Sequence, residues 1–146
     1  MAHTLIIGYG NPLRGDDGLG WHVAQRLAAV LPRHRARIET CHQLTPELAE
    51  PISRAALVIF IDAEYLAPVG RLFCRHLTPG AVLPGTFSHY LTPWMLLACV
   101  REWYGTCPEA VVFSVAGQSF DCGEALSPAV VAVLPELLER ICALVP

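Results

Sequence analysis

The sequence predicts an α/β fold: one domain of three layers, in which a mostly parallel, twisted sheet of about five strands carries helices on both faces. Short apolar runs alternate along the chain with segments of helical periodicity, which is the order typical of this fold class. The hydrophobic fraction is 53% and the charged fraction 16%, as expected when a sheet is buried on both faces. A chain of 146 residues without repeats or a linker fits one domain, and we expect that domain to span residues 1–146.

A glycine-rich segment, residues 8–18, separates the first predicted strand from the first predicted helix. Residues 4–7 form a short apolar run, which predicts a buried strand. Asp16 is a candidate N-cap for the helix, and Pro32 stops it. Between them apolar residues recur at helical spacing, at Leu19, Val23, Leu27 and Val30 or Leu31.

Four further apolar runs predict the remaining strands. The clearest is residues 56–61, which ends at Asp62. The others are residues 37–41, 70–74 and 110–115. Residues 79–84 contain two prolines and a glycine, which predicts a loop.

Three more helices are predicted to begin at one kind of dipeptide, a hydroxyl-bearing N-cap followed by proline at the first helical position. These dipeptides are Thr45-Pro46, Thr92-Pro93 and Ser127-Pro128. The first helix is short and reaches about Ser53, and the second ends at Gly105. Pro135 lies within the helical pattern of the third, so we expect that helix to be kinked or split.

Charge and composition argue against several classes of protein. The net charge is −3, with ten arginines and no lysine, so a nucleic-acid interface has little support. No apolar run approaches the roughly 20 residues of a membrane span, and the first residues lack the features of a secretory leader. We therefore expect a cytoplasmic protein. The six cysteines form no C-x-x-C pair, which argues against a zinc site of the usual spacing and predicts mostly reduced, buried thiols.

The glycine-rich segment fits a cation site better than a nucleotide site. Leu13 occupies the third glycine position of the dinucleotide motif, and the chain has no lysine for a phosphate loop. Two adjacent acids at the start of a helix, Asp16 and Asp17, would also repel phosphate. They either complement the helix dipole, or one caps the helix while the other faces the crevice beyond the sheet.

Asp62 and His89 are the other candidate functional residues. Asp62 follows a buried strand, at the edge where open α/β sheets bind ligands, although an acid there also serves as an Asx turn. His89 precedes the helix predicted at Thr92, and His42, after another strand end, is its competitor. Asp17, Asp62 and His89 together would supply two oxygens and one nitrogen to a borderline divalent metal with open positions. The chain contains neither a G-x-S-x-G elbow nor an H-E-x-x-H motif.

Five segments, which follow one another over nearly the whole chain, resemble the maturation endopeptidases of nickel-iron hydrogenases. The longest is Ile-Ile-Gly-Tyr-Gly-Asn-Pro-Leu-Arg-Gly-Asp-Asp-Gly-Leu-Gly, residues 6–20. The others are His-Gln-Leu-Thr-Pro-Glu from His42, Phe-Ile-Asp-Ala from Phe60, Ser-His-Tyr-Leu-Thr-Pro from Ser88, and Gly-Gln-Ser-Phe-Asp-Cys-Gly-Glu-Ala-Leu-Ser from Gly117.

The resemblance implies a twisted sheet with helices on both sides and a hydrolase that acts as an endopeptidase. Its expected partner is the large-subunit precursor of a nickel-iron hydrogenase, from which it removes a C-terminal extension after nickel has been inserted. The nickel would belong to the substrate, with no cofactor tightly bound to the protease, which we expect to be a monomer. The resemblance places the metal-contacting, catalytic residues at Asp17, Asp62 and His89.

One position departs from the family pattern, because some relatives carry glutamate where this chain has Asp17. The shorter side chain requires a closer approach of the loop or a longer metal contact, and it leaves Asp16 as a less favoured substitute ligand. Two other functions stay open from the sequence: a nickel-sensing adaptor or chaperone in hydrogenase assembly without proteolytic activity, and a metal-dependent hydrolase of small molecules.

Overall fold

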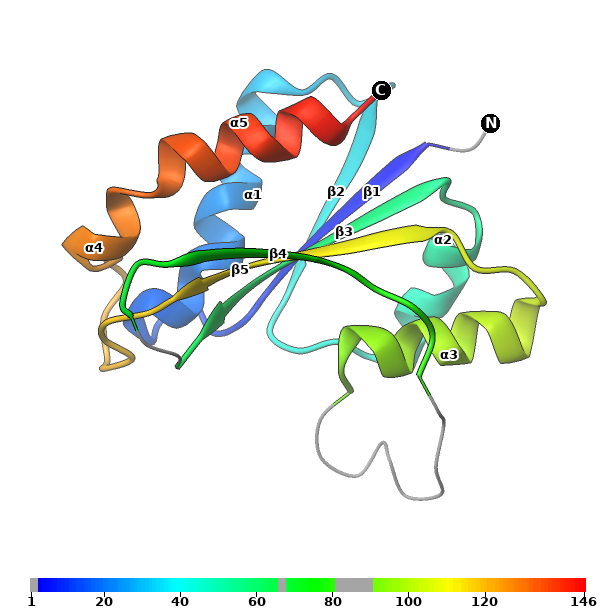
Figure 1. Ribbon diagram of the computed structural model, residues 1–146, viewed down its shortest axis with the longest axis horizontal. Coiled ribbons are helices and arrows are strands. Elements are labelled where there is room, and N and C mark those ends of the chain that lie inside the picture. The colour runs from blue at the N-terminus through cyan, green and yellow to red at the C-terminus, as the bar shows by residue number, and fades with distance from the viewer. Residues whose placement is uncertain (1–2, 66–67, 81–90) are drawn as a thin grey trace.

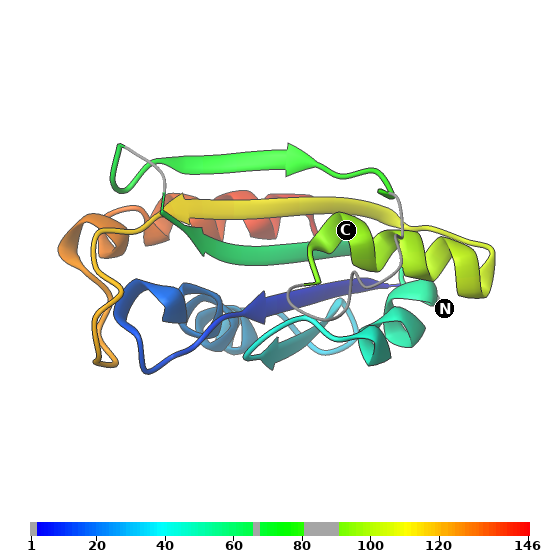
Figure 2. The same ribbon diagram turned by 90° about the horizontal axis from the view of Figure 1, so that it is seen from below.

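The structure is a computed structural model that describes residues 3–65, 68–80 and 91–146. Its centre is a five-stranded sheet with the strand order β2-β1-β3-β5-β4. Four strands are parallel, and β4 runs antiparallel to β5 (Figure 2). The strands are β1 (Thr4–Tyr9), β2 (Ala36–Cys41), β3 (Leu57–Glu64), β4 (Leu72–His76) and β5 (Glu109–Ala116). The predicted α/β class with a mostly parallel sheet of five strands is confirmed.

Helices cover both faces of the sheet (Figures 1 and 2). On one face lie α1 (Leu19–Val30), α4 (Pro128–Val131) and α5 (Leu134–Leu144), and on the other α2 (Ala49–Ser53) and α3 (Pro93–Tyr104). Two short 3-10 helices, η1 (Gly15–Gly18) and η2 (Pro46–Leu48), lead into α1 and α2. The predicted split of the last helix is confirmed, because α5 restarts at Leu134 with Pro135 in its first turn.

Each face of the sheet has its own apolar core, as expected for a sheet between two helical layers. Ile6, Ile59 and Phe113 pack against buried residues of α1 and α5. Leu5, Ile7, Val58 and Phe60 pack against Ile52 of α2 and against Leu96, Leu97 and Val100 of α3. The alternation along β1 and β3 therefore assigns each strand residue to one core or the other.

Some predicted bounds are corrected by the sheet. β3 does not end at Asp62 but continues to Glu64, since Asp62 and Glu64 still pair in register with Ser114 and Ala116 of β5. β4 starts two residues later than predicted, at Leu72, and is the edge strand that runs antiparallel. The predicted loop 79–84 lies largely outside the described residues. The six cysteines are all free: Cys99 is buried, Cys122 is exposed, and the other four are partly buried against the two cores, so the predicted burial holds only in part.

The crossing of β1 and α1 depends on two glycines in van der Waals contact. A Cβ atom on Gly8 would lie 2.2 Å from the carbonyl oxygen of Gly20, and one on Gly20 would lie 2.6 Å from the amide nitrogen of Tyr9. Both neighbours are backbone atoms, so they cannot rotate away. The close approach brings the start of α1, with the glycine-rich segment, against the end of β1.

The Gly20→Ala variant is therefore expected to lower the free energy of unfolding by about 2–3 kcal/mol, as overpacking against backbone does. Chemical denaturation of the purified protein would measure this loss. Gln25→Ala, on the exposed side of α1, is the matched control and should stay within about 0.5 kcal/mol of the parent. Equal stability of Gly20→Ala and the parent would contradict the close approach of α1 to β1.

Candidate active site

Three parallel strands, β1, β3 and β5, bring their carboxyl ends to one edge of the sheet. The loop after β1 and the segment 117–127 after β5 lie at this same edge (Figure 2). They are joined by hydrogen bonds from Gly15 N to the Gly123 carbonyl, 2.8 Å, and from Gly123 N to the Leu13 carbonyl, 2.8 Å. Two segments that resemble the family motifs, far apart in the sequence, therefore build one end of the molecule.

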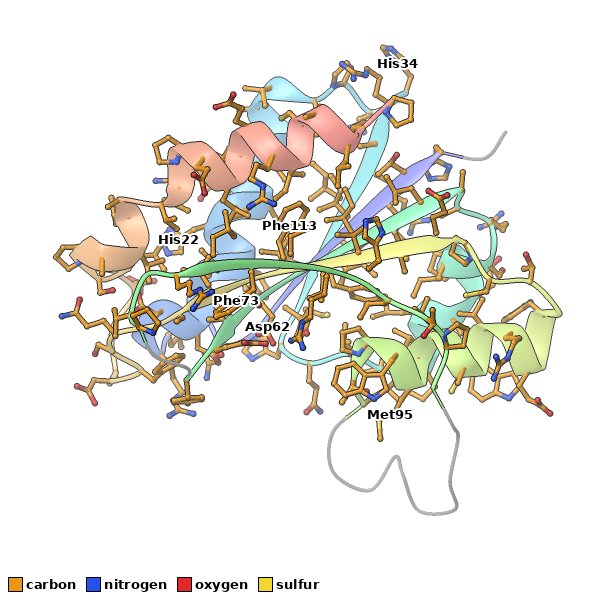
Figure 3. All side chains as sticks on the ribbon, viewed as in Figure 1. His22, His34, Asp62, Phe73, Met95 and Phe113 are labelled. Atoms are coloured by element: carbon orange, nitrogen blue, oxygen red, sulfur yellow. The ribbon has the colours of Figure 1, made fainter. Side chains whose placement is uncertain are left out.

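Asp62 lies at this end of β3, on the face that carries α3 (Figure 3). The Tyr9 hydroxyl donates a hydrogen bond to Asp62 Oδ2, 3.2 Å, and the Ala63 amide donates one to Asp62 Oδ1, 2.8 Å. The pKa of Asp62 is raised to about 7: burial raises it most, the charges of Asp17 and Glu64 also raise it, and these two hydrogen bonds only partly offset the rise. This carboxyl therefore changes its charge near neutral pH.

Asp17 is presented by η1 at the start of α1. Its Oδ2 accepts a hydrogen bond from the backbone amide of Asn11, 2.8 Å, and the Asp17 side chain is only partly buried. Gly10, with φ +136°, makes this arrangement possible, because a Cβ there would lie 2.1 Å from the Asp17 carbonyl oxygen and 3.3 Å from Asp17 Oδ1. Asp17 is close enough to Asp62 for its charge to raise the pKa of that carboxyl.

Asp16 has a different role from its neighbour. The side chain is fully buried, and it accepts hydrogen bonds from the amides of Gln118, Ser119 and Ser127 and from the Ser127 hydroxyl, at 2.7–3.0 Å. Burial raises the pKa of Asp16, but these hydrogen bonds outweigh it, so that pKa lies below its ordinary value. Hydrogen bonds to Asp16 thus hold the segment 117–127 against η1.

The prediction that Asp16 caps α1 is wrong, because the N-cap position is Gly18, without a side-chain hydrogen bond. The carboxylate points away from the helix and toward the segment after β5. With both oxygens occupied by protein donors, Asp16 is also a poor substitute for Asp17 as a metal ligand. Of the two adjacent acids, Asp17 is the one on the side of Asp62.

His89, the third predicted site residue, lies outside the described residues. Within residues 3–65, 68–80 and 91–146, no three His, Cys, Asp or Glu side chains form a group that could hold a metal ion. His42, the competitor of His89, is exposed and meets the Trp21 ring edge-on, with 5.7 Å between ring centroids. The described part of the site is therefore an acidic pair, Asp17 and Asp62.

Sequence reasoning did not select Tyr9, although it stands in the first motif. The parallel register explains its place: Tyr9 pairs with Cys41 of β2 and packs against the core on the α3 side, the same face as Asp62. Burial and the neighbouring Asp62 raise the pKa of Tyr9 well above its ordinary value. The hydroxyl therefore stays protonated and can donate a hydrogen bond to the carboxylate. The signal was the last position of the first strand, which shares a face with Asp62 of β3.

Two more polar groups occupy this face of the sheet. Glu64 Oε1 lies 3.2 Å from Arg75 of β4, while Glu64 Oε2 and the Ser114 hydroxyl are buried without a hydrogen-bond partner among the described residues. Ser114 is directly opposite Asp62 in the β3–β5 register. Carboxylate and hydroxyl oxygens thus concentrate at one end of an otherwise apolar sheet, which is a suitable surrounding for a cation or for water.

Comparison with solved structures gives close matches along the whole chain. The [NiFe] hydrogenase maturation protease HycI from Thermococcus kodakarensis KOD1 is 25% identical with a TM-score of 0.77, covering 97% of this chain and 91% of that chain. The hydrogenase maturating endopeptidase HybD from E. coli is 21% identical with a TM-score of 0.73, covering 97% and 90%. The hydrogenase 2 maturation peptidase from Thaumarchaeota archaeon SCGC_AB-539-E09 is 21% identical with a TM-score of 0.70, covering 97% and 96%.

No family model matches the chain, and no curated protein matches it. The resemblance consequently rests on the fold, on its near-complete coverage and on the motifs. All three structures are named as proteases, endopeptidases or peptidases, which supports the prediction that this chain is a hydrolase of the protease class. The structural neighbours of this chain are [NiFe] hydrogenase maturation proteases, and the family resemblance in its sequence motifs is thereby confirmed.

Proposed function

We propose that this protein is an endopeptidase that removes the C-terminal extension from the nickel-loaded large-subunit precursor of a nickel-iron hydrogenase. The observation that carries the proposal is the acidic pair of Asp17 and Asp62 at the carboxyl end of the sheet, in a fold whose neighbours are maturation proteases. An open end of this kind is where α/β sheets bind their ligands.

The nickel of the precursor would be recognised as part of the substrate. Asp17 and Asp62 offer carboxylate oxygens, and His89 is proposed as the nitrogen ligand that completes the set. A mixed set of oxygens and nitrogen with open positions suits a borderline divalent metal. Holding the nickel from one side orients the polypeptide that carries it, so the scissile bond is positioned relative to the two carboxylates.

Hydrolysis then requires a water, a base and a proton for the leaving nitrogen. A water oxygen adds to the scissile carbonyl carbon, the base takes its proton, and the C–N bond breaks as the nitrogen receives a proton, leaving a carboxylate and an amine. A carboxyl whose pKa is about 7 is suited to accept and return a proton near neutral pH. This property supports Asp62 as the base, provided that one of its oxygens accepts the proton while the other contacts nickel; direct attack by a carboxylate is the alternative route.

Recognition through nickel would make the reaction a checkpoint, because an empty precursor lacks the group that the acidic pair holds. We expect this protein to cleave the nickel-loaded precursor from the same organism and to leave the nickel-free precursor intact. Mass spectrometry of the large subunit would show loss of a C-terminal peptide. Cleavage of both forms would support the protease function and show that nickel is not needed for recognition. Cleavage of neither form would favour the adaptor function.

Substitution of the three proposed ligands tests the site itself. Asp17→Ala, Asp62→Ala and His89→Ala should each abolish cleavage while circular dichroism shows an unchanged fold. Normal cleavage by all three variants would overturn the assignment. Calorimetry with free nickel separates a protease from a resident metalloenzyme: weak binding without the precursor is expected here, and tight binding would favour a small-molecule hydrolase.

Two further parts of the proposal concern the setting of the reaction. We place it in the cytoplasm, where free cysteines such as these six stay reduced, and we propose that the protein acts as a monomer. Among the described residues, no helix has both the length and the apolar character needed to cross a membrane. Light scattering at assay concentration and fractionation of the source cells would check both points.

A further inference from the structure

A long groove runs beside β2, one of the two edge strands of the sheet. Among the described strands β2 pairs with β1 alone, so its other side is open there. Between β2 and α1 lie two surface hollows of about 710 Å³ and about 530 Å³, and Ala28 of α1 and Ile38 of β2 line both of them. The two hollows therefore form one groove along the strand.

One end of the groove lies beside the loop that follows β1. Pro12 and Trp21 line this end, and Trp21 Nε1 donates a hydrogen bond to the Gly10 carbonyl, 2.8 Å. Gly10 N in turn donates to the carbonyl of Cys41, the last residue of β2. The next residue along the loop, Asn11, holds the Asp17 carboxylate. The loop after β1 therefore connects this end of the groove to Asp17.

The other end of the groove is basic. Arg33, His34 and Arg37 line it, and Figure 3 shows His34 at the end of the molecule away from Asp62. Arg35, within the same run, is already bonded to the carbonyls of Val145 and Pro146. Arg37 pairs with Glu39 at 2.7 Å, but Arg37 is exposed and Glu39 only partly buried, and such a surface pair contributes little. Arg33 has no ion-pair partner among the described residues.

The charges along the groove give it a direction. Glu124 lines the near hollow, and Asp17, Asp62 and Glu64 form a negative cluster at the carboxyl end of the sheet. These negative charges repel a carboxylate that Arg33 and Arg37 attract at the other end. β2 has six residues and spans about 20 Å. An extended peptide that starts at the site and ends in a carboxylate matches that length, the open strand edge and the polarity.

We propose that the groove binds the part of the substrate that is cut off. The C-terminal extension of the precursor would lie as an added strand, antiparallel to β2, over Ala28 and Ile38, with its terminal carboxylate against Arg33 and Arg37. This inference rests on the proposed function, because it assigns the two sides of the scissile bond. Nickel would hold the amino-terminal side, and the groove the carboxyl-terminal side.

A pair of neighbouring alanines on α1 supplies the main test. Ala28 and Ala29 are both exposed, and only Ala28 lines the groove. With nickel-loaded precursor as substrate, Ala28→Trp should raise KM about tenfold and leave kcat within about twofold, as loss of uniform binding does. Ala29→Trp should behave like the unmodified protein. Equal KM values for Ala28→Trp and Ala29→Trp would overturn the proposal.

Charge reversal tests the basic end. The double variant Arg33→Glu, Arg37→Glu should raise KM about fivefold at low salt, and the difference should shrink at high salt. Arg54→Glu is the control, since Arg54 is an exposed arginine at the C-cap of α2 with a local partner, Glu50, just as Arg37 has Glu39. A double variant that matches Arg54→Glu at low salt would contradict a carboxylate at this end.

A binding measurement separates failure of the groove from failure of the protease. The probe is a fluorescein-labelled synthetic peptide of the precursor's C-terminal residues, with a free carboxylate or as the C-terminal amide, measured by fluorescence anisotropy. The free acid should bind the unmodified protein more tightly than the amide, and Ala28→Trp should lose this binding while Ala29→Trp keeps it. If the unmodified protein does not cleave the precursor, the binding measurement still shows whether the peptide binds in the groove. If it cleaves the precursor but all variants bind the peptide equally, the groove assignment fails and the proposed protease function stands.

Discussion

The Asp62→Asn variant is expected to lose cleavage of the nickel-loaded precursor by about 10²–10⁴-fold, the range for loss of a positioned acid or base. Asparagine has the same shape, so Ala63 N can still donate to its oxygen, but it carries no negative charge for nickel and accepts no proton from water. The amide nitrogen would also replace the oxygen that faces the Tyr9 hydroxyl. Product formation over time, followed by mass spectrometry, measures the effect.

Asp121→Asn is the matched control for this loss. Asp121 is exposed, and among the described side chains its carboxylate forms a hydrogen bond only with Ser119. This variant should cleave at the rate of the unmodified protein. Full activity of the Asp62→Asn variant would show that Asp62 takes no part in the reaction and that Asp17 does not act as one of a pair.

The same substitution should change how stability depends on pH. The pKa of Asp62 is about 7 in the folded protein and near 3.8 in the unfolded chain. Between these values the folded protein binds more protons than the unfolded chain, so its free energy of unfolding falls as the pH rises. Asp62→Asn lacks this loss, and without nickel it should be more stable than the parent by about 1–3 kcal/mol at pH 8, with little difference at pH 4. Urea denaturation at both values measures the difference, and equal pH profiles would contradict the shifted pKa.

The Asp16→Asn variant is expected to lower the free energy of unfolding by about 3 kcal/mol, the largest loss predicted for a single polar group here. Asp16 is fully buried and accepts four hydrogen bonds from the segment 117–127. Asparagine supplies one acceptor oxygen and turns an amide group toward the remaining donors, which leaves a buried donor unpaired. Urea denaturation at pH 7 measures the loss.

Asp121→Asn again supplies the control, with an expected change within about 0.5 kcal/mol for an exposed side chain. Because the pKa of Asp16 is depressed, its stabilisation is present above the unfolded value of 3.8 and is lost as the pH falls below that value. The difference between Asp16→Asn and the parent should therefore shrink in acid. A difference that is equally large at pH 7 and pH 2.5 would contradict a role for the charge.

The structural role of Asp16 also predicts a loss of activity by an indirect route. The segment 117–127 and the loop before Asp17 are held together by Asp16 and by the hydrogen bonds between Gly15, Leu13 and Gly123. Freeing one segment disturbs the other, because both lie at the carboxyl end of the sheet. Asp16→Asn should then lose activity in proportion to its loss of structure, whereas Asp62→Asn loses activity and keeps its fold.

Much of the fold could be predicted from local patterns. Buried parallel strands are short, apolar and bounded by turns, so the runs around Ile6, Ile59 and Val112 marked three central strands. Proline after a hydroxyl residue marked the starts of α3 and α4, and Pro135 marked the restart at α5. These features depend on residues near in sequence, which is why they are visible without tertiary structure.

The acid residues of the site could be selected from their positions at element ends, but their roles could not be assigned. Asp16 and Asp17 are adjacent in one motif, and both are acids before a helix. Only the packing of the segment 117–127, about a hundred residues away, encloses Asp16 and leaves Asp17 on the side of Asp62. The contribution of Tyr9 likewise appears only when β1 and β3 are set in register.

The sequence by itself therefore determined the class of fold, the order of most of its elements and the acids that gather at one edge, because hydrophobic period, proline and glycine act within a few residues. Tertiary structure alone decided the antiparallel edge strand β4, the buried role of Asp16, the hydrogen bond from Tyr9 and the groove along β2. Each of these depends on contacts between segments distant in the chain. The burial of a charged group depends on the same contacts, so no local sequence pattern reveals it.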